Sequence, residues 1–448
     1  MRLKSDNKNL ETAFAWATQK AKQFVVTGTK NGPINLGDNG KWYGPGGAVL
    51  SAPTAPWAAP RDYGAAFWAG YHDRTAYYIR DFVHHATGAA LLGMYEELYQ
   101  MYHTFAASAK EETGWYALWA FNFDHSVYYM DTPDPHRFVR EITAQFELVE
   151  TGYRLFLWTG DRRYIDNPEI ACFADHIMTD FIDRQDGVLR RKKNGIPEGK
   201  GDIFKGSATY NERGFCAVEA ADSIAALYAA RCCYTEILRL RGQANSARQE
   251  AEKARALQRY FNNQWSRIPG KSAYCYAIDK WGFKHYRWHK HRGKIYGAET
   301  LEFIALKNLS TPGIRNNRLL DYIDQKQSDP RTRVENIESL TYLPDLFFAN
   351  GQPDRAWRYM QEILSKKDLP HEHKSQGANG DYPEIAFTIV AQILTGIVGL
   401  QPDPDTGALL VHPQLPRGIH RIEVEDLKYR DGCYSIQVTA DGATVQRQ

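Results

Sequence analysis

Apolar residues recur every three or four positions over long stretches of the chain. One series runs from Val139 to Phe156, a second from Leu91 to Phe105 and a third from Ile224 to Leu238. This spacing places the apolar side chains on one face of an α-helix, because a helix has 3.6 residues per turn. The pattern predicts a mainly α-helical protein whose helices each bury one face.

Glycines end several of these helical series. Gly160 and Gly242 each follow one of these series, Gly351 follows a further expected helix, and all three precede polar residues or proline that can begin the next helix. Such turns join neighbouring helices into antiparallel hairpins. The three glycines are separated by 82 and 109 residues, which is too irregular for a short-period solenoid. We therefore expect a toroid of helical hairpins.

The segment 385–400 is apolar on nearly every face. A helix of this kind has no solvent side and belongs to an inner layer. With 16 residues it is shorter than the roughly 20 that a membrane-spanning helix needs. An inner layer wrapped by amphipathic outer helices predicts a two-layer (α/α)6 barrel over residues 1–404.

Two other regions have a different pattern of apolar and polar residues. After residue 404 apolar and polar residues alternate, with Asp-Gly turns at 431–432 and 441–442, so 405–448 is predicted to form a small antiparallel β appendage packed on the barrel. Residues 27–70 are rich in glycine, proline and tryptophan. So long a loop in a compact domain is usually functional, and we expect a rim over the barrel mouth.

Composition excludes several classes of protein. The chain has 55 Lys and Arg against 53 Asp and Glu, so no basic excess favours nucleic-acid binding. No apolar run is long enough to cross a membrane, and residues 1–12 contain no apolar signal core. The six cysteines have no C-x-x-C spacing; we expect buried free thiols, although a disulfide stays open.

Aromatic residues are frequent: 11 Trp, 27 Tyr and 20 Phe make up 13% of the chain. Many lie beside polar residues, as Trp288 does in the sequence HYRWHK. Such rings either fill the core or bind the flat C–H face of a sugar while nearby charges bind its hydroxyls. Trp288 is therefore a candidate substrate-binding residue.

Two acidic segments precede expected inner helices. In the first, Tyr78, Arg80 and Asp81 offer a fork of donors beside an acceptor, which suits vicinal hydroxyls. A capping aspartate with a solvated arginine is the alternative. In the second, Glu212 follows Tyr210 in a Gly/Ser/Thr loop, where desolvation would raise the pKa of its carboxyl and let it donate a proton. A surface ion pair with the next arginine is the alternative.

A third acidic segment, 370–384, directly precedes the apolar helix. Glu372 lies between His371 and His373, a setting that suits a base acting on water, and Tyr382 and Glu384 follow. The two histidines could instead ligate a metal, but no third ligand is evident, so we expect neither a metal site nor a cofactor.

Further acids compete for the same roles and are interpreted as solvated or supporting groups. They are Glu299, Glu302, Glu335 and Glu338, together with Asp124 and its neighbour His125.

Three of these segments resemble the six-hairpin glycosidase superfamily of (α/α)6 barrels. Residues 78–81 are similar to the aromatic-x-Arg-Asp segment of the glucoamylase family, whose Arg-Asp pair binds the sugar being cleaved. Asn211-Glu212 resembles the loop that supplies the general acid, and the segment around Glu372 resembles the one that supplies the general base. Residues 382–402 look like the end of bacterial barrel hydrolases. The resemblance covers about residues 70–448.

The resemblance implies an exo-acting glycoside hydrolase with an oligosaccharide or glycoside as partner. Glu212 would be the acid and Glu372 the base, with Arg80 and Asp81 holding a terminal uronic acid or neutral hexose. Inversion follows if the two carboxyls stand roughly 6.5–9.5 Å apart. One departure is that His373 stands where the family usually has glutamine. No starch-specific segment is present.

Three alternatives remain open. An unsaturated-uronyl hydrolase on the same barrel would depend on Asp81 and Asp124. A sugar epimerase would use a histidine as general acid and base, and His289 or His373 could serve. A carbohydrate-binding protein would bind oligosaccharides without turnover. The sugar, its anomer and its linkage are not determined by the sequence.

Overall fold

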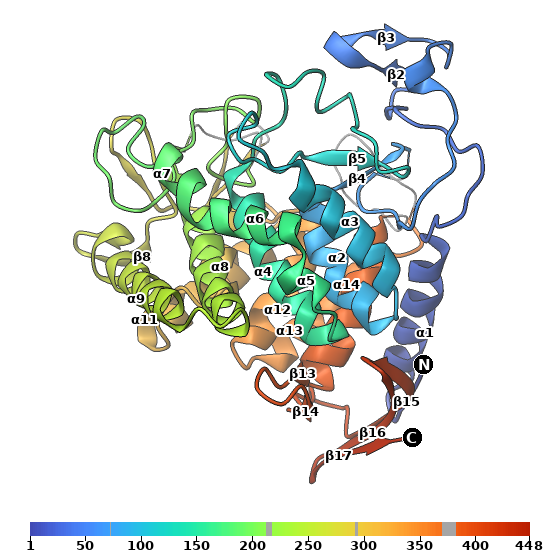
Figure 1. Ribbon diagram of the computed structural model, residues 1–448. Coiled ribbons are helices and arrows are strands. Elements are labelled where there is room, and N and C mark those ends of the chain that lie inside the picture. The colour runs from blue at the N-terminus through green and yellow to red at the C-terminus, as the bar shows by residue number, and fades with distance from the viewer. Residues whose placement is uncertain (72, 212–216, 292–293, 370–381) are drawn as a thin grey trace.

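The computed structural model describes all residues except 72, 212–216, 292–293 and 370–381. Within that part of the chain, six helices form a closed inner ring. They are α2 (Ile79–Leu91), α4 (Ile142–Thr159), α8 (Ala221–Leu240), α10 (Ala298–Leu306), α12 (Ile337–Ala349) and α14 (Pro383–Ala391). Each packs against the next in this order, and α14 packs back against α2 (Figure 1).

An outer layer of helices surrounds this ring. The outer helices are α3 (Tyr95–Ser108), α5 (Arg163–Asp166), α6 (Pro168–His176), α9 (Ala244–Tyr260), α11 (Ile314–Ser328) and α13 (Pro353–Leu364). Each packs against the inner helix that precedes it, except α6, which packs against α3 and α5. The N-terminal helix α1 (Lys8–Gln23) covers α14, the last inner helix. The predicted (α/α)6 toroid is confirmed.

The three hairpin glycines have the conformation that the sequence predicted. Gly160, Gly242 and Gly351 have φ angles of 73°, 74° and 66°. Only glycine adopts this left-handed region without a steric penalty, so the helix ends at each of them and the chain reverses.

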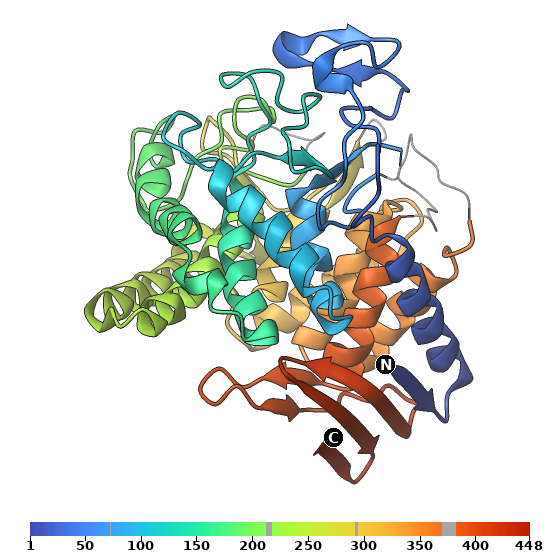
Figure 2. The ribbon, with the colours of Figure 1, turned by 45° about the vertical axis from the view of Figure 1, so that its right-hand side comes forward.

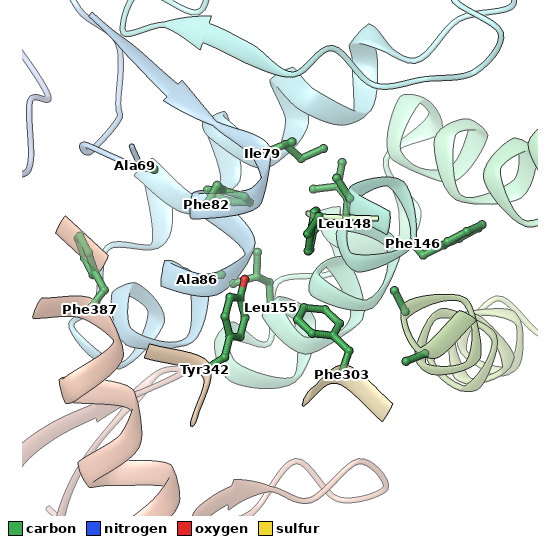
Figure 3. Close-up of a cluster of buried hydrophobic side chains, with 14 of the residues drawn as sticks. Ala69, Ile79, Phe82, Ala86, Phe146, Leu148, Leu155, Phe303, Tyr342 and Phe387 are labelled. Carbon is green, nitrogen blue, oxygen red and sulfur yellow. The ribbon is translucent and has the colours of Figure 1, made fainter. Parts of the chain in front are cut away.

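Burial separates the two layers. Every residue of α14 is buried, whereas α13 buries only one face. Figure 3 shows side chains of the inner helices gathered inside the ring, among them Phe82, Leu148, Phe303, Tyr342 and Phe387. The helices approach closely, since a Cβ on Gly88 of α2 would lie 2.1 Å from the carbonyl oxygen of Phe387. The short π-helix η5 (Gln392–Ile397) continues α14.

The C-terminal strands form a four-stranded antiparallel sheet. Its order is β1 (Arg2–Ser5), β15 (Arg421–Tyr429), β16 (Gly432–Thr439) and β17 (Gly442–Arg447). The sheet lies at one end of the barrel, beside the N-terminus (Figure 2). The sequence predicted the last three strands and missed β1, whose Leu3 lies opposite Val424. The division of the chain at residue 404 stays a prediction.

The opposite end of the barrel carries loops and short strands. In the predicted rim, β2 (Trp42–Tyr43) pairs with β3 (Val49–Leu50), next to the short helices η1 (Pro45–Gly47) and η2 (Pro56–Ala58). The pair lies at the end of the molecule away from the C-terminal sheet (Figure 2). At the same end, β4 (Ala76–Tyr78) pairs with β5 (Ala120–Asn122) and leads directly into α2. The N-terminus of α2 therefore lies at the rim end.

The remaining elements are short. They are η3 (Ile177–Phe181), α7 (Ile182–Gln185), β6 (Glu219–Ala220), η4 (Phe261–Trp265), β7 (Arg267–Ile268), β8 (Lys271–Tyr274), β9 (Ala277–Ile278), β10 (Lys284–His285), β11 (His289–His291), β12 (Lys294–Tyr296), β13 (Leu400–Pro402) and β14 (Leu409–Val411). The cysteines within the described ranges, Cys172, Cys232, Cys233, Cys275 and Cys433, are free thiols. None of the described helices combines the length and apolarity that crossing a membrane requires.

Candidate active site

Each inner helix carries an acidic residue at or beside its first turn. These residues are Asp81 on α2, Glu141 before α4, Asp222 on α8, Glu299 on α10, Glu338 on α12 and Glu384 on α14. A helix N-terminus has partial positive charge, which favours a carboxylate there. One acid at a helix start is a local preference, but an acid at the start of all six inner helices needs a further explanation.

Arg80 shows that these N-termini converge. Its Nη2 lies 3.4 Å from an oxygen of Glu299, and Glu338 and Glu141 also act on its charge. Asp81 in turn interacts with both Glu338 and Glu384. Carboxylates from the starts of four other inner helices thus act on Arg80 and Asp81, at the end of the barrel that carries the rim.

Tyr382 connects two of these acids. Its hydroxyl oxygen lies 2.6 Å from Oδ1 of Asp81 and 2.5 Å from Oε1 of Glu338. The side chain is 1% exposed. A phenol has one proton, so two such short contacts need a second proton on one of the carboxyls. Burial, and then Glu338 and Glu384, raise the pKa of Asp81 well above its usual value.

Glu384 lies next to Asp81 and is oriented by two donors. His84 on α2 binds its Oε1 through Nδ1, and the hydroxyl of Thr341 donates to the same oxygen at 2.9 Å. The His84 ring stacks on Tyr342 with 3.8 Å between ring centroids. Burial lowers the pKa of His84, but Glu384 and Asp345 outweigh it and raise the pKa to about 9. A protonated His84 is therefore the cation that balances Glu384.

Arg80 has donors left over for a ligand. Its Nη1 donates to the carbonyl oxygen of Tyr210 at 3.3 Å, and its guanidinium lies 4.4 Å from the centre of the Tyr210 ring. Its Nη2 is buried and makes no hydrogen bond to any residue that the structure describes. Unused N–H donors on a buried guanidinium beside carboxylates suit the hydroxyls or carboxylate of a sugar.

Asp222 fixes the loop that leads toward Glu212. Its Oδ2 accepts hydrogen bonds from the backbone N–H of Tyr210 at 2.9 Å and from the hydroxyl of Thr209 at 2.8 Å. The Tyr210 hydroxyl donates to Glu147 at 2.5 Å. Burial raises the pKa of Asp222 to about 6, against these stabilising hydrogen bonds. The backbone is thus held firmly up to residue 211.

The structure brings together five of the residues that the sequence singled out. They are Arg80, Asp81, Tyr210, Tyr382 and Glu384. Glu212, Glu372 and His373 lie outside the described residues.

Four other candidates have different surroundings. Tyr78 is two residues before Arg80 in the sequence, but its hydroxyl accepts a hydrogen bond from Arg74 at 3.0 Å. Asp124 accepts from Ser126, and Nδ1 of His125 lies 2.8 Å from the hydroxyl of Tyr77.

Trp288 lies beside the outer helix α11. Its indole N–H donates to the carbonyl of Thr332 at 2.9 Å, and its backbone N–H donates to Tyr322 on α11 at 3.0 Å. It lines a cavity of about 550 Å³ together with other aromatic and basic residues, including His289.

Among the competing acids, Glu338 and Glu299 join the cluster, whereas Glu335 is exposed and pairs with Arg333 at 3.2 Å. Glu302 is buried, and burial followed by Glu299 raises the pKa of its carboxyl well above the usual value. Asp222 and Glu141 were not considered from the sequence. An acid at the predicted start of each inner helix is the signal that would have found them.

Comparisons with solved structures find the same fold. A rhamnosidase from Bacillus sp. GL1 superposes with a TM-score of 0.68 at 11% identity, over 100% of this chain and 41% of that one. A rhamnosidase from Aspergillus terreus gives 0.57 at 11% identity, over 98% of this chain and 45% of that one. A kojibiose phosphorylase from the human microbiome, described as putative, gives 0.55 at 10% identity, over 100% of this chain and 63% of that one.

The chain thus spans less than half the length of the two rhamnosidases. Models of protein families give no match to this sequence, and neither do curated proteins. At these identities the superpositions establish the fold, which is the six-hairpin toroid.

Proposed function

We propose that this protein is an exo-acting, inverting glycoside hydrolase whose acidic cluster binds the terminal sugar. The observation that carries the proposal is the convergence of acids from the inner helices around Arg80 and Asp81. Burying several carboxylates together with few cations destabilises a fold, so such clusters are concentrated at functional sites. The toroid is also the fold of the two rhamnosidases named above.

In this proposal Arg80 and the Asp81–Tyr382–Glu338 chain hold the sugar. Arg80 donates to a hydroxyl or a carboxylate of the sugar from Nη2, which is paired with Glu299 but makes no hydrogen bond among the described residues, while Glu338 and Glu384 accept from hydroxyls. Groups fixed by buried hydrogen bonds keep their positions during the reaction, which lowers the entropic part of the barrier. This arrangement suits the recognition of one terminal ring.

Glu212 and Glu372 are proposed as the general acid and the general base. The loop that Asp222 and Glu147 hold through Thr209 and Tyr210 ends directly before Glu212, and Glu372 precedes Tyr382 by ten residues. Glu212 would protonate the leaving oxygen while Glu372 activates a water on the opposite face of the ring. Cleavage in this way inverts the configuration at the anomeric carbon.

The test screens terminal rhamnosides, glucosides, galactosides and uronides with wild-type protein, then repeats the best substrate with Glu212→Gln and Glu372→Gln. Each variant is expected to lose about 100- to 10,000-fold in kcat, because general acid and base catalysis contributes about 10²–10⁴. Glu335→Gln is the matched control, since Glu335 is exposed and its carboxylate pairs with nearby Arg333.

NMR of the first product tests inversion directly. A product with the opposite anomeric configuration supports the proposal, and retention contradicts the inverting assignment. Near-full activity of either variant excludes that residue. Binding of oligosaccharides by calorimetry without any turnover would instead identify a carbohydrate-binding protein.

A further inference from the structure

Three side chains beside the sugar-binding cluster form a compact set of metal ligands. Asp81 and His85 lie one turn apart on α2, and Glu384 begins the neighbouring helix α14. One oxygen or nitrogen from each lies within 4.8 Å of the other two, and all three residues are buried.

His85 is the observation that points to a ligand. Its side chain is 0% exposed, yet neither ring nitrogen has a hydrogen-bond partner among the residues described. Buried polar atoms in native proteins are nearly always satisfied, so each exception needs an explanation. The ring is held by aromatic neighbours, with Phe387 at 5.0 Å and Phe67 at 6.3 Å between ring centroids. Its orientation is therefore fixed by packing and not by a hydrogen bond.

We propose that Asp81, His85 and Glu384 bind a divalent transition-metal ion of the Zn²⁺ class. One imidazole nitrogen and two carboxylate oxygens suit Zn²⁺ or Mn²⁺, whereas Ca²⁺ and Mg²⁺ prefer oxygen ligands alone. Metal–ligand bonds of about 2.0–2.1 Å at the tetrahedral angle place two ligand atoms roughly 3.4 Å apart, so ligand atoms that lie up to 4.8 Å apart have to approach by about 1 Å or more when the ion binds.

The surrounding hydrogen bonds orient the two carboxylates for this role. Tyr382 binds Oδ1 of Asp81, while His84 and Thr341 both bind Oε1 of Glu384. One oxygen of each carboxylate is thereby held in place, which leaves the other for a metal ion. Partners of this kind fix the orientation of ligands in known metal sites and are needed for high affinity.

Arg80 and protonated His84 already supply positive charge at this point, and a divalent ion would add to it. Asp81, Glu338 and Glu384 interact with one another below the surface. Two positive charges among three carboxylates reduce their mutual repulsion. Three protein ligands leave a coordination position open, and a sugar hydroxyl or a water would fill it. Only this last step rests on the proposed function.

The experiment measures metal content without any substrate. Protein stripped with EDTA is dialysed against low micromolar Zn²⁺, and bound zinc per chain is determined by elemental analysis for wild type, His85→Phe and His103→Gln. His85→Phe keeps a ring between Phe67 and Phe387. His103 is the matched control, because its Nε2 pairs with Glu169 at 2.7 Å on the protein surface.

We expect one zinc per chain in the wild type and in His103→Gln, and binding weaker by about a hundredfold or more in His85→Phe. Equal binding by His85→Phe, or no zinc and no Mn²⁺ in the wild type, overturns the proposal. If His85→Phe does not fold, anomalous diffraction from a zinc-soaked wild-type crystal tests whether zinc binds at this site. A peak among the three side chains supports the site, and a peak elsewhere or none rejects it. Hydrolysis by a protein that binds no zinc would reject this inference and leave the proposed function standing. Zinc binding by a protein that hydrolyses no glycoside would support this inference and reject the proposed function.

Discussion

Two groups of buried acids inside the toroid are treated in opposite ways. Glu147 and Glu150 on α4 share Lys307, whose Nζ lies 2.7 Å and 2.6 Å from their carboxylates. Burial raises the pKa of Glu150, but Lys307 and then Arg154 outweigh it, so the pKa falls below its usual value. The pKa of Asp81, by contrast, is raised well above its usual value by burial and then by the neighbouring carboxyls of Glu338 and Glu384.

This difference suggests that Glu147 and Glu150 stabilise the fold, whereas the acids around Asp81 are placed to bind a ligand. A buried acid with a matched cation is a closed ion pair that needs nothing else. The acids around Asp81 keep part of their mutual repulsion, since Glu338 and Glu384 both raise the pKa of Asp81. Selection for stability alone would remove such a cluster, which is why strained electrostatics mark candidate sites. The following predictions test this contrast, from the largest expected effect to the smallest.

Lys307→Met should strongly destabilise the protein. The substitution leaves Glu147 and Glu150 buried without their cation, and losing one partner of a buried pair costs about 3–5 kcal/mol. Chemical denaturation followed by circular dichroism measures the change in unfolding free energy. Lys253→Met is the control, because Lys253 is half exposed and Arg231 also binds its partner Glu250. Equal losses in both variants would contradict the closed-pair interpretation.

Asp222 should make stability depend on pH. Burial raises the pKa of its carboxyl in the folded protein to about 6 from 3.8. Between these values the unfolded chain has released its proton while the folded protein still holds it, so rising pH favours unfolding. The contribution is present below about pH 4 and falls by about 3 kcal/mol by pH 6.

Comparing unfolding free energies of wild type and Asp222→Asn at several pH values isolates this contribution, because asparagine does not titrate. The wild type should lose stability relative to the variant as pH rises from 4 to 6. A difference that stays constant over that range would show that Asp222 titrates normally.

Tyr382→Phe should affect the acidic cluster more than the fold. The variant removes the hydroxyl that bridges Asp81 and Glu338 and keeps the buried ring. On the best substrate of the screen, kcat should fall about 10- to 100-fold, which corresponds to roughly 1.4–2.7 kcal/mol. Tyr234→Phe is the control, since its hydroxyl binds Asp175 on the outer side. Loss of activity in both variants alike would argue against a specific role for Tyr382.

Glu252→Gln should have the smallest effect. Glu252 pairs with Arg255 on the exposed face of α9, where water screens the interaction. Thermal unfolding should not change measurably. A clear drop in melting temperature would show that surface pairs matter here as much as buried ones, and would weaken the contrast drawn above.

Local patterns predicted much of the fold. The hairpin turns at Gly160, Gly242 and Gly351 and a buried helix within 385–400 were recognisable because glycine conformation and helical periodicity act over a few residues. The helix itself ends at Ile397, and Leu400 already belongs to strand β13. Strand β1 and the covering of α14 by α1 were missed. Both depend on contacts between the two ends of the chain, which no local pattern records.

The candidate site was predicted in part for the same reason. Arg80, Asp81, Tyr382 and Glu384 were noticed because each lies beside a recognisable helix start. Asp222 was missed, since its short sequence context looks like an ordinary helix beginning. Glu338 was treated as a competing acid, and only its contact with Tyr382 shows that it faces Asp81.

The sequence by itself determined a ring of helical hairpins, because apolar periodicity and left-handed glycines are properties of neighbouring residues. Tertiary structure alone decided which acids meet. Asp81 and Tyr382 are 301 positions apart, and their hydrogen bond exists only because the ring closes between α14 and α2. Ring closure brings the first turns of distant helices together, and their charges then act on one another through a medium of low polarity.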